Sequence, residues 1–350
     1  MKAIIIIIGV TAGLLIGFFP RFDMPKPKWW KYLAVCLMLI SICMAILPPL
    51  AEQPNVAKYM TSKINDHVSS VILKVSPGTL KYDHAANLWT ADFYSPHRPE
   101  KIEKMIVNGR DIPPEIKTDA KMILSMRYDT ASNHFTYIGT QYVNPLLTFP
   151  YVPQLEQQIR ILSFHVPVAW ISVLAFLMSM IFSIKYLRTR DFKYDLISSS
   201  TAALGLVFSI LATVTGMVWA KFNWGSFWNW DPRETSIFIL LLIYGAYFSL
   251  RSAIENPESK ARLSSVYSIL AFVTVPFLVF VLPRILSGLH PGSENDTTTG
   301  PILSSKEGTL SLVQQISFSF GFMAITVAFF WMLNIYLRYR KLKQHIEGEF

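Results

Sequence analysis

Seven apolar blocks of about 20 residues constrain this chain more than any other feature. About 20 apolar residues are needed for a helix to cross the ~30 Å hydrocarbon core of a bilayer. Charged residues make up 16% of the chain, against about 25% in a typical soluble protein. The blocks therefore predict an all-α polytopic membrane protein with about seven transmembrane helices. They cover residues 3–20, 32–50, 162–184, 196–220, 235–254, 263–286 and 309–337.

Lys and Arg residues gather in every second connection between these blocks. The basic segments are residues 21–31, 185–193 and 251–262 and the C-terminal tail from residue 338. Short loops rich in Lys and Arg stay on the cytoplasmic side of a membrane, so we expect all four segments on that side. The membrane itself would be the inner (plasma) membrane of a cell. The N-terminus and residues 51–160, 221–234 and 287–308 then lie outside. The formal net charge of +9 thus orients the chain and gives no sign of nucleic-acid binding.

The first block begins like a signal peptide, with Met-Lys followed by an apolar run. Phe18-Phe19-Pro20 is not the small-residue site that a signal peptidase requires. We therefore expect this block to remain as a membrane anchor. Cys36 and Cys43 both lie in the second block and form no C-x-x-C motif. They are expected to serve packing and not redox chemistry.

A polar insertion separates the second and third blocks. It divides the chain into residues 1–50 with two helices, an external (periplasmic) β-rich domain at 51–155, and a five-helix membrane domain at 156–350. Alternating apolar residues and the turn signals Pro77-Gly78 and Asn108-Gly109 favour a small barrel or sandwich. The expected strands are Val68–Val75, Asn87–Ser95, Lys101–Val107, Lys121–Tyr128 and His134–Val143.

Four histidines are scattered through this insertion without metal-ligand spacing, and solvated surface positions are expected for them. They are His67, His84, His97 and His134. Basic and acidic residues nearly balance in the insertion, so it offers no basic face for nucleic acid. The insertion itself does not reveal what it binds.

Tryptophans crowd the connection at residues 221–235. Trp224, Trp228 and Trp230 fall within seven residues, and Trp219 and Phe222 precede them. Tryptophan belts at membrane interfaces are common, but they place only one or two rings at each helix end. This density favours a platform for a large flat apolar ligand such as a porphyrin.

Polar residues complete this connection. Arg233 would pair with propionate groups of a porphyrin. Asp231-Pro232 followed by Glu234 also forms a helix start, with an acidic cap and proline at the first helical position. For Asp231, a capping role and a ligand-contact role both remain open.

Two histidines lie at the same predicted membrane face as the tryptophans. His165 opens the third block and His290 follows the sixth, 125 residues later. Either one alone is better explained as an interfacial side chain or a helix cap. Together, beside the tryptophans, they predict a pair of axial ligands to a haem iron.

These residues match a known family. The stretch Trp-Gly-Ser-Phe-Trp-Asn-Trp-Asp-Pro-Arg-Glu-Thr at 224–235 resembles the tryptophan-rich WWD signature of the CcmC/CcmF/CcsA cytochrome c assembly proteins. His-Val-Pro-Val-Ala-Trp at 165–170 is similar to CcmC, whereas the Asp-Pro-Arg-Glu-Thr end looks more like CcsA. The resemblance covers about residues 155–340. The extra first helix and the insertion depart from the simple six-helix CcmC pattern.

The resemblance implies a membrane protein that handles haem b. Such a protein presents haem at the outer face for attachment to apocytochrome c, or passes it to a haem chaperone or to other cytochrome c maturation membrane proteins. His165 and His290 would be the iron ligands, which makes them the metal site. The remaining contact residues would be Trp170, Trp224, Trp228, Trp230, Asp231 and Arg233. Since no other histidine lies in an apolar block, a CcmC-like role is preferred over a CcsA-type channel with an internal haem.

Two other classes of function are open. A quinol-linked electron-transfer subunit would need histidine pairs inside the bilayer. A polytopic enzyme for lipid-linked substrates would use an external cluster such as Asp231, Arg233 and Glu234, but it leaves the tryptophans unexplained. A haem-delivery protein needs no catalytic residue of its own, because the cofactor carries the chemistry.

Overall fold

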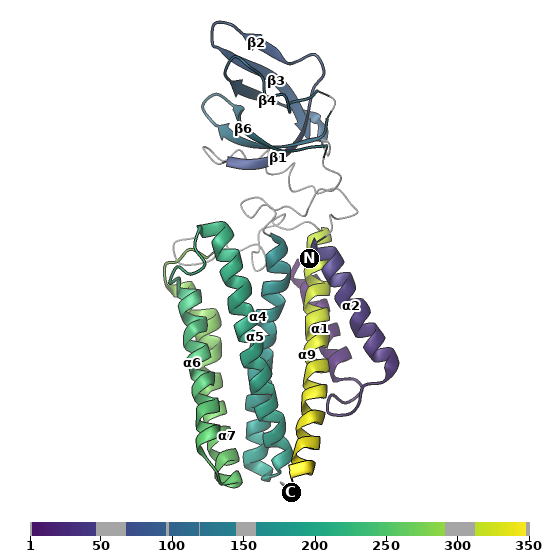
Figure 1. Cartoon of the computed structure of the whole chain (residues 1–350), viewed down its shortest axis with the longest axis vertical. Coiled ribbons are helices and arrows are strands. Elements are labelled where there is room, and N and C mark those ends of the chain that lie inside the picture. Colours follow the sequence, from purple (N-terminus) through teal and green to yellow (C-terminus); the bar gives the residue numbers. More distant parts are fainter. Residues whose placement is uncertain are drawn as a thin grey trace. The chain divides into compact units, whose positions relative to one another are not determined.

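The computed structural model of this chain contains a set of long helices and a β-sheet (Figure 1). The structure describes residues 2–46, 68–95, 98–118, 120–144, 159–290 and 312–347. The chain divides into a helical unit, from residues 1–45, 160–307 and 314–350, and a β unit from residues 46–159 and 308–313. Each unit has its own hydrophobic core.

The helical unit contains long apolar helices joined by short connections. Its elements are α1 (Lys2–Phe18), α2 (Lys28–Ile46), α4 (Ile159–Thr189), α5 (Phe192–Trp224), α6 (Pro232–Ala253), α7 (Pro257–Pro276), η1 (Phe277–Val281), α8 (Leu282–Ile285) and α9 (Leu312–Glu347). Among the described residues, six segments are long and apolar enough to cross a membrane, with Pro257–Ile285 counted as one. The prediction of a polytopic helical membrane protein is therefore confirmed. The apolar part of α1, Ile4–Phe18, is shorter, so the count of seven spans stays a prediction.

Local capping fixes where these helices begin and end. Asp191 caps α5 by accepting a hydrogen bond from the Lys193 N–H, and Asn256 caps α7 in the same way. Gly225 ends α5 with φ of 81°, a left-handed conformation that favours glycine. The connections stay short because each helix is stopped and restarted by its own local sequence.

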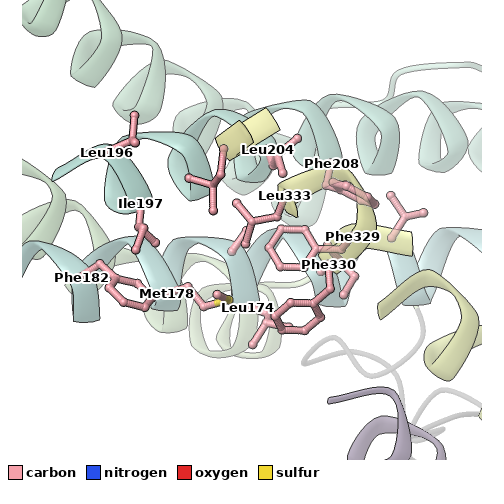
Figure 2. Close-up of a cluster of buried hydrophobic side chains, with 14 of the residues drawn as sticks. Leu174, Met178, Phe182, Leu196, Ile197, Leu204, Phe208, Phe329, Phe330 and Leu333 are labelled. Atoms are coloured by element: carbon pink, nitrogen blue, oxygen red, sulfur yellow. The ribbon is translucent and has the colours of Figure 1, made fainter. Parts of the chain in front are cut away.

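The core of the helical unit lies between α4, α5 and α9. Figure 2 shows apolar side chains of this core lying between these helices. Protein interiors of this kind are close-packed, with few voids between side chains. The labelled members are Leu174, Met178, Phe182, Leu196, Ile197, Leu204, Phe208, Phe329, Phe330 and Leu333. This cluster holds α4 and α5, which carry His165 and the start of the tryptophan loop.

The helix α1 packs against α9 through three glycines spaced four residues apart. A Cβ atom on Gly9 would lie 2.3 Å from the Ser319 carbonyl oxygen, and one on Gly17 would lie 2.0 Å from the Phe330 ring. Gly13 is similarly tight against α9. Small residues at this spacing let two helix backbones approach closely.

The turn after α1 is closed by a buried lysine. The Lys26 ammonium donates to the carbonyl oxygens of Gly17 at 2.8 Å, Phe19 at 3.3 Å and Pro20 at 2.6 Å. These oxygens belong to the end of α1, whose last carbonyls have no partner inside the helix. The Trp30 indole N–H donates to the Ile16 carbonyl at 2.8 Å, so α2 is tied to α1 on both sides of the turn.

Cys36 and Cys43 are both exposed on α2. The expectation that they pack inside the protein is therefore wrong. A seven-residue spacing places both on one face of a helix, and in α2 that face points away from the neighbouring helices.

The β unit is a six-stranded sheet that closes on itself. Its strands are β1 (Val68–Val75), β2 (Lys81–Asp83), β3 (Leu88–Ser95), β4 (Arg98–Asn108), β5 (Met122–Asp129) and β6 (His134–Val143). The strand order is β1-β5-β6-β4-β3-β2, with an additional β1–β3 pairing. The β4–β6 pair is parallel and the other pairs are antiparallel. Of the two expected alternatives, the structure has the barrel-like one.

The interior of the β unit is filled by alternate residues of its strands. Val71, Leu73 and Val75 of β1 are fully buried, because alternate residues of a strand point to the same face. Ile72, on the other face, packs against Ile123. The turn glycines Gly78 and Gly109 have φ of 73° and 108°. The short strand β2 was not predicted, and β4 begins at Arg98 instead of Lys101.

The four insertion histidines fall into two groups. His67 and His97, with residues 51–66 and 145–155, lie outside the described residues. His84 is exposed, and His134 is partly exposed with its Nε2 3.2 Å from the Ser132 Oγ. Within the described ranges, no group of three or more His, Cys, Asp or Glu side chains is placed to hold a metal ion.

Candidate functional site

The candidate site begins at the start of α6. Asp231 caps this helix: its Oδ1 accepts the Arg233 N–H at 2.9 Å, and Glu234 completes a capping box. Pro232 occupies the first turn, where its missing N–H costs nothing. The capping interpretation of this segment is confirmed. The cap buries Asp231, which is 4% exposed, and directs its free lone pairs toward the residues after α8.

The carboxylate that caps α6 also holds His290. The Nδ1 of His290 lies 2.7 Å from the Asp231 Oδ1, and the Leu289 N–H donates to Oδ2 at 2.7 Å. Burial alone would raise the pKa of Asp231, but the hydrogen bond and charge of His290, with the two backbone N–H donors, lower it to about 2. Burial lowers the pKa of His290 below its usual value despite the opposing effect of Asp231. The contact with His290 therefore keeps Asp231 ionised, as an acceptor for the His290 Nδ1–H.

Glycine at position 288 permits this contact. A Cβ atom there would lie 2.7 Å from the Asp231 Oδ2 and 2.9 Å from the Pro232 Cδ. Real Cβ atoms do not approach other atoms so closely, so any side chain at this position has to displace the Asp231 carboxylate. Gly288 thus sets the approach of the post-α8 segment to α6.

His165 is held in a comparable way on α4. Its Nδ1 lies 3.1 Å from the Thr215 Oγ1 on α5. Gly216 leaves room for the ring, since a Cβ there would be 3.0 Å from the His165 Cε1. His290 and Arg233 are near enough to act electrostatically on His165. The two predicted ligand histidines therefore lie at the same end of the helical unit.

The described residues leave one nitrogen of each imidazole unused. Both rings use Nδ1 for their hydrogen bond, and no hydrogen bond to Nε2 of either ring is formed within the described residues. A metal-ligating histidine characteristically engages one ring nitrogen with a supporting group and presents the other. The donor set therefore fits the iron of a haem.

Aromatic rings surround His290 on two sides. The Trp219 ring stacks on it with centroids 5.4 Å apart and an interplanar angle of 28°, and the Trp224 ring meets it edge-on at 4.6 Å. Trp228 and Trp230 form a second group, perpendicular to each other at 5.6 Å and each packed against Phe238. Trp230 is 68% exposed. The rings therefore form one group that holds a histidine and one that faces outward.

Three buried N–H groups on α4, α5 and α6 have no hydrogen-bond partner among the described residues. They are the Arg233 Nε, the Trp219 Nε1 and the Trp170 Nε1. A buried donor without an acceptor is costly, and the carboxylate oxygens of a ligand would satisfy such groups. Arg233 also lies near a second cation, Arg284 of α8, which strengthens the attraction for an anion.

Trp170 is placed differently from the other predicted site residues. It packs against the apolar cluster of α4, α5 and α9, and no contact links it to the rings around His290 among the described residues. By contrast, sequence reasoning did not assign a role to Thr215, Gly216 or Gly288. Trp219 had a signal, as part of the tryptophan density, but the other three look like ordinary helix and loop residues.

Comparison with known proteins decides the family. The model of the family described as "CcmC: Heme exporter protein C" matches residues 120–346, well over half of the chain. The chain belongs to the CcmC family. The match begins just before β5 and extends to the last turn of α9, so it includes both histidines and the tryptophan loop.

Individual relatives are about one third identical to this chain over the segments that align with it. Heme exporter protein C of Paracoccus denitrificans is 33% identical over 142 residues, 41% of this chain and 59% of the relative. The same protein of Rhodobacter capsulatus is 32% identical over 144 residues, 41% of this chain and 60% of the relative. Cytochrome c biogenesis protein CcsA of Oenothera argillicola is 34% identical over 113 residues, 32% of this chain and 34% of the relative. The chain thus spans about 60% of the length of the heme exporter relatives.

Proposed function

We propose that this chain binds haem b as its cargo, with His165 and His290 as the two axial ligands of the iron, and delivers it in cytochrome c maturation. Membership of the CcmC family and relatives named for heme export and cytochrome c biogenesis support this role. One observation carries it. Two imidazoles at one end of the helical unit each engage Nδ1 and keep Nε2 for a metal.

The surrounding residues have distinct roles in this proposal. Trp224, Trp228 and Trp230 provide aromatic faces for the macrocycle, and Asp231 orients His290. The guanidinium of Arg233 pairs with a propionate group, which supplies the acceptor that its buried Nε lacks. No residue of this chain acts as a catalytic nucleophile or base in the proposed role.

The proposed location is the inner membrane, with the haem site on its outer (periplasmic) face and the C-terminus in the cytoplasm. The support is the basic character of the connections at residues 185–193 and 251–262. They join the helix ends opposite to those that carry His165 and Asp231. Haem held at the outer face would be attached to apocytochrome c or passed to a haem chaperone, and the β unit is the proposed docking element for such partners.

Absorption spectra of the purified full-length chain test the ligand assignment. The chain is prepared in detergent and titrated with haemin, and the same is done for His165→Ala and His290→Ala. The wild type is expected to give the low-spin bands of a six-coordinate haem. Each substitution should abolish these bands or convert them to a high-spin spectrum.

A matched control separates ligation from the general loss of a histidine. His84 is exposed in the β unit, so His84→Ala should leave the spectrum unchanged. Low-spin bands that survive both His165→Ala and His290→Ala would remove the assignment. Trp228→Ala should weaken haem retention while membrane insertion stays normal, whereas equal haem content with poor expression would indicate a folding role for this ring.

The two alternative functions gain no support from the site. Electron transfer across the bilayer needs stacked histidine pairs, but only His165 and His345 fall within the described helices of the chain. An enzyme for lipid-linked substrates would need free carboxylates in the external loop. Asp231 instead binds backbone N–H groups and His290 through both oxygens, and the Glu234 Oε2 accepts from the Asn229 and Asp231 N–H groups at the start of α6.

A further inference from the structure

The hydrogen-bond acceptors behind the two histidines differ in charge. His290 is backed by the carboxylate of Asp231 at 2.7 Å, whereas His165 is backed by the neutral hydroxyl of Thr215 at 3.1 Å. We propose that this difference sets an order of release, in which His290 keeps the iron and His165, positioned by Thr215, leaves first when haem is handed on. The proposal rests on the haem-binding function given above.

Hydrogen-bond accounting fixes the same tautomer in both rings. The Thr215 hydroxyl has one hydrogen, which it donates to the Leu211 carbonyl at 2.8 Å and shares with the Ala212 carbonyl at 3.1 Å. It can therefore only accept from the His165 Nδ1. At Asp231 both carboxylate oxygens accept backbone N–H groups. Since an ionised carboxylate has no hydrogen to donate, it also accepts from the His290 Nδ1–H. Each ring then carries its hydrogen on Nδ1 and a lone pair on Nε2.

The partner of Nδ1 controls how strongly Nε2 binds a metal. A carboxylate behind an imidazole raises the basicity of the ligating nitrogen and fixes the ring orientation. A hydroxyl that already donates its hydrogen elsewhere gives a weaker, neutral hydrogen bond. The Asp231 carboxylate is itself held by the Leu289 N–H, and the Trp219 ring stacks on His290. His290 is therefore both the stronger and the better oriented of the two ligands.

Release of His165 is a simple ligand exchange. The bond between iron and Nε2 breaks, the electron pair stays on nitrogen, and the incoming ligand supplies a pair of its own. No electron is transferred to or from the protein. The hydrogen on Nδ1 remains on the Thr215 bond throughout, so the step also needs no proton. After the exchange, the haem would still be held by His290.

Cyanide titration of the ferric haem complex tests which ligand leaves. Cyanide replaces one axial histidine, and its apparent affinity rises when the leaving ligand is weakened. Thr215→Val removes the acceptor of Nδ1 at nearly constant volume, and Thr215→Ala is a second variant in case valine disturbs the helix contact. Since loss of such a supporting group costs about 10–100-fold in metal affinity, both are expected to raise cyanide affinity by about tenfold or more.

Two controls separate positioning from packing. Thr215→Ser keeps the hydroxyl and should restore the wild-type cyanide affinity. Thr213→Val removes a neighbouring hydroxyl that donates only to the Ser209 carbonyl, so it should leave cyanide affinity unchanged. Circular dichroism of every variant checks that the helical content is the same.

Two results would overturn the proposal. One is unchanged cyanide affinity in both Thr215→Val and Thr215→Ala. The other is an Asp231→Asn variant whose cyanide affinity increases more than that of Thr215→Val, because His290 would then be the leaving ligand. Failure of the proposed function itself looks different: the wild type would form no low-spin complex with haemin before any cyanide is added.

Discussion

The carboxylate of Asp231 leaves no room for a side chain at Gly288. A Cβ atom at Gly288 would lie 2.7 Å from the Asp231 Oδ2, the oxygen that also accepts the Leu289 N–H. The closeness follows from one carboxylate serving two purposes, as the cap of α6 and as the support of His290. The start of one helix and the orientation of a proposed haem ligand therefore depend on the same residue.

Substitution of Gly288 should impair haem binding with little effect on folding. In Gly288→Ala, the added methyl group pushes the Asp231 carboxylate away from His290, and the loss of this support should lower haem affinity by about tenfold. Haemin titration measures the change. Gly245→Ala on α6 is the control, because nothing lies within 4 Å of its Cβ position. Equal haem affinity in both variants would contradict the role of Gly288.

Substitution of Gly216 should act on the other ligand. A Cβ atom in Gly216→Ala would be 3.0 Å from the His165 Cε1, a contact that the ring can relieve by a small rotation. We expect a loss of haem affinity of a few-fold for alanine and a much larger loss for Gly216→Leu, since overpacking grows with side-chain size. A spectrum that shifts toward high spin would show the weakened His165 bond. No difference between alanine and leucine would argue against this contact.

A buried ion pair joins the start of α5 to the end of α6. We expect it to contribute strongly to the free energy of unfolding. Asp195 accepts two hydrogen bonds from Arg251, at 2.7 and 2.9 Å, and both side chains are about 12–13% exposed. Arg251→Met leaves a buried carboxylate without a partner, which costs about 3–5 kcal/mol. Asp195→Leu in the same chain should recover most of this loss. Denaturant unfolding in detergent measures the free energies.

The exposed pair Arg21–Asp23 is the control for this experiment. Its arginine side chain is 65% exposed, and exposed pairs contribute about 0–1 kcal/mol. Arg21→Met should therefore change the free energy of unfolding far less than Arg251→Met. Similar losses in the two single variants would show that burial of the Asp195–Arg251 pair does not matter.

Because Lys26 is buried, we expect the free energy of unfolding to increase at alkaline pH. Burial lowers its pKa from 10.5 to about 8, against a smaller opposing effect of Asp23. Between about pH 8 and pH 10.5 the unfolded chain then binds more protons than the folded one, so the free energy of unfolding rises with pH. The slope of thermal stability against pH in this range should be smaller in Lys26→Met. An identical slope in the two proteins would contradict the lowered pKa.

Local signals made most of the fold predictable from sequence. Apolar blocks gave the membrane helices, and the Asp231-Pro232 cap marked where α6 begins, because both depend on residues close together in the chain. The closure of the sheet by β1–β3 and the parallel β4–β6 pair depend on distant residues and could not be foreseen. The exposure of Cys36 and Cys43 likewise depends on which face of α2 meets other helices.

The same division applies to the site. His165, His290 and the tryptophans could be proposed as site residues from sequence because their residue types carry specific chemistry. Thr215 lies 50 residues from His165, and its role appears only when α4 and α5 are packed. Gly288 precedes Leu289, whose N–H donates to Asp231 across 58 residues of sequence, so its role also appears only in the folded chain. Supporting residues of this kind have no signature of their own in a single sequence.

The glycine contact between α1 and α9 has a consequence for biosynthesis. The Ser319 Oγ donates to the Ile5 carbonyl across a separation of 314 residues, so α1 leaves the ribosome long before the surface of α9 that receives it. Until then the three glycines of α1 have no α9 surface to pack against. The helical unit therefore closes after translation of α9, and a chain interrupted before residue 312 would be left with an unmatched first helix for quality control to recognise.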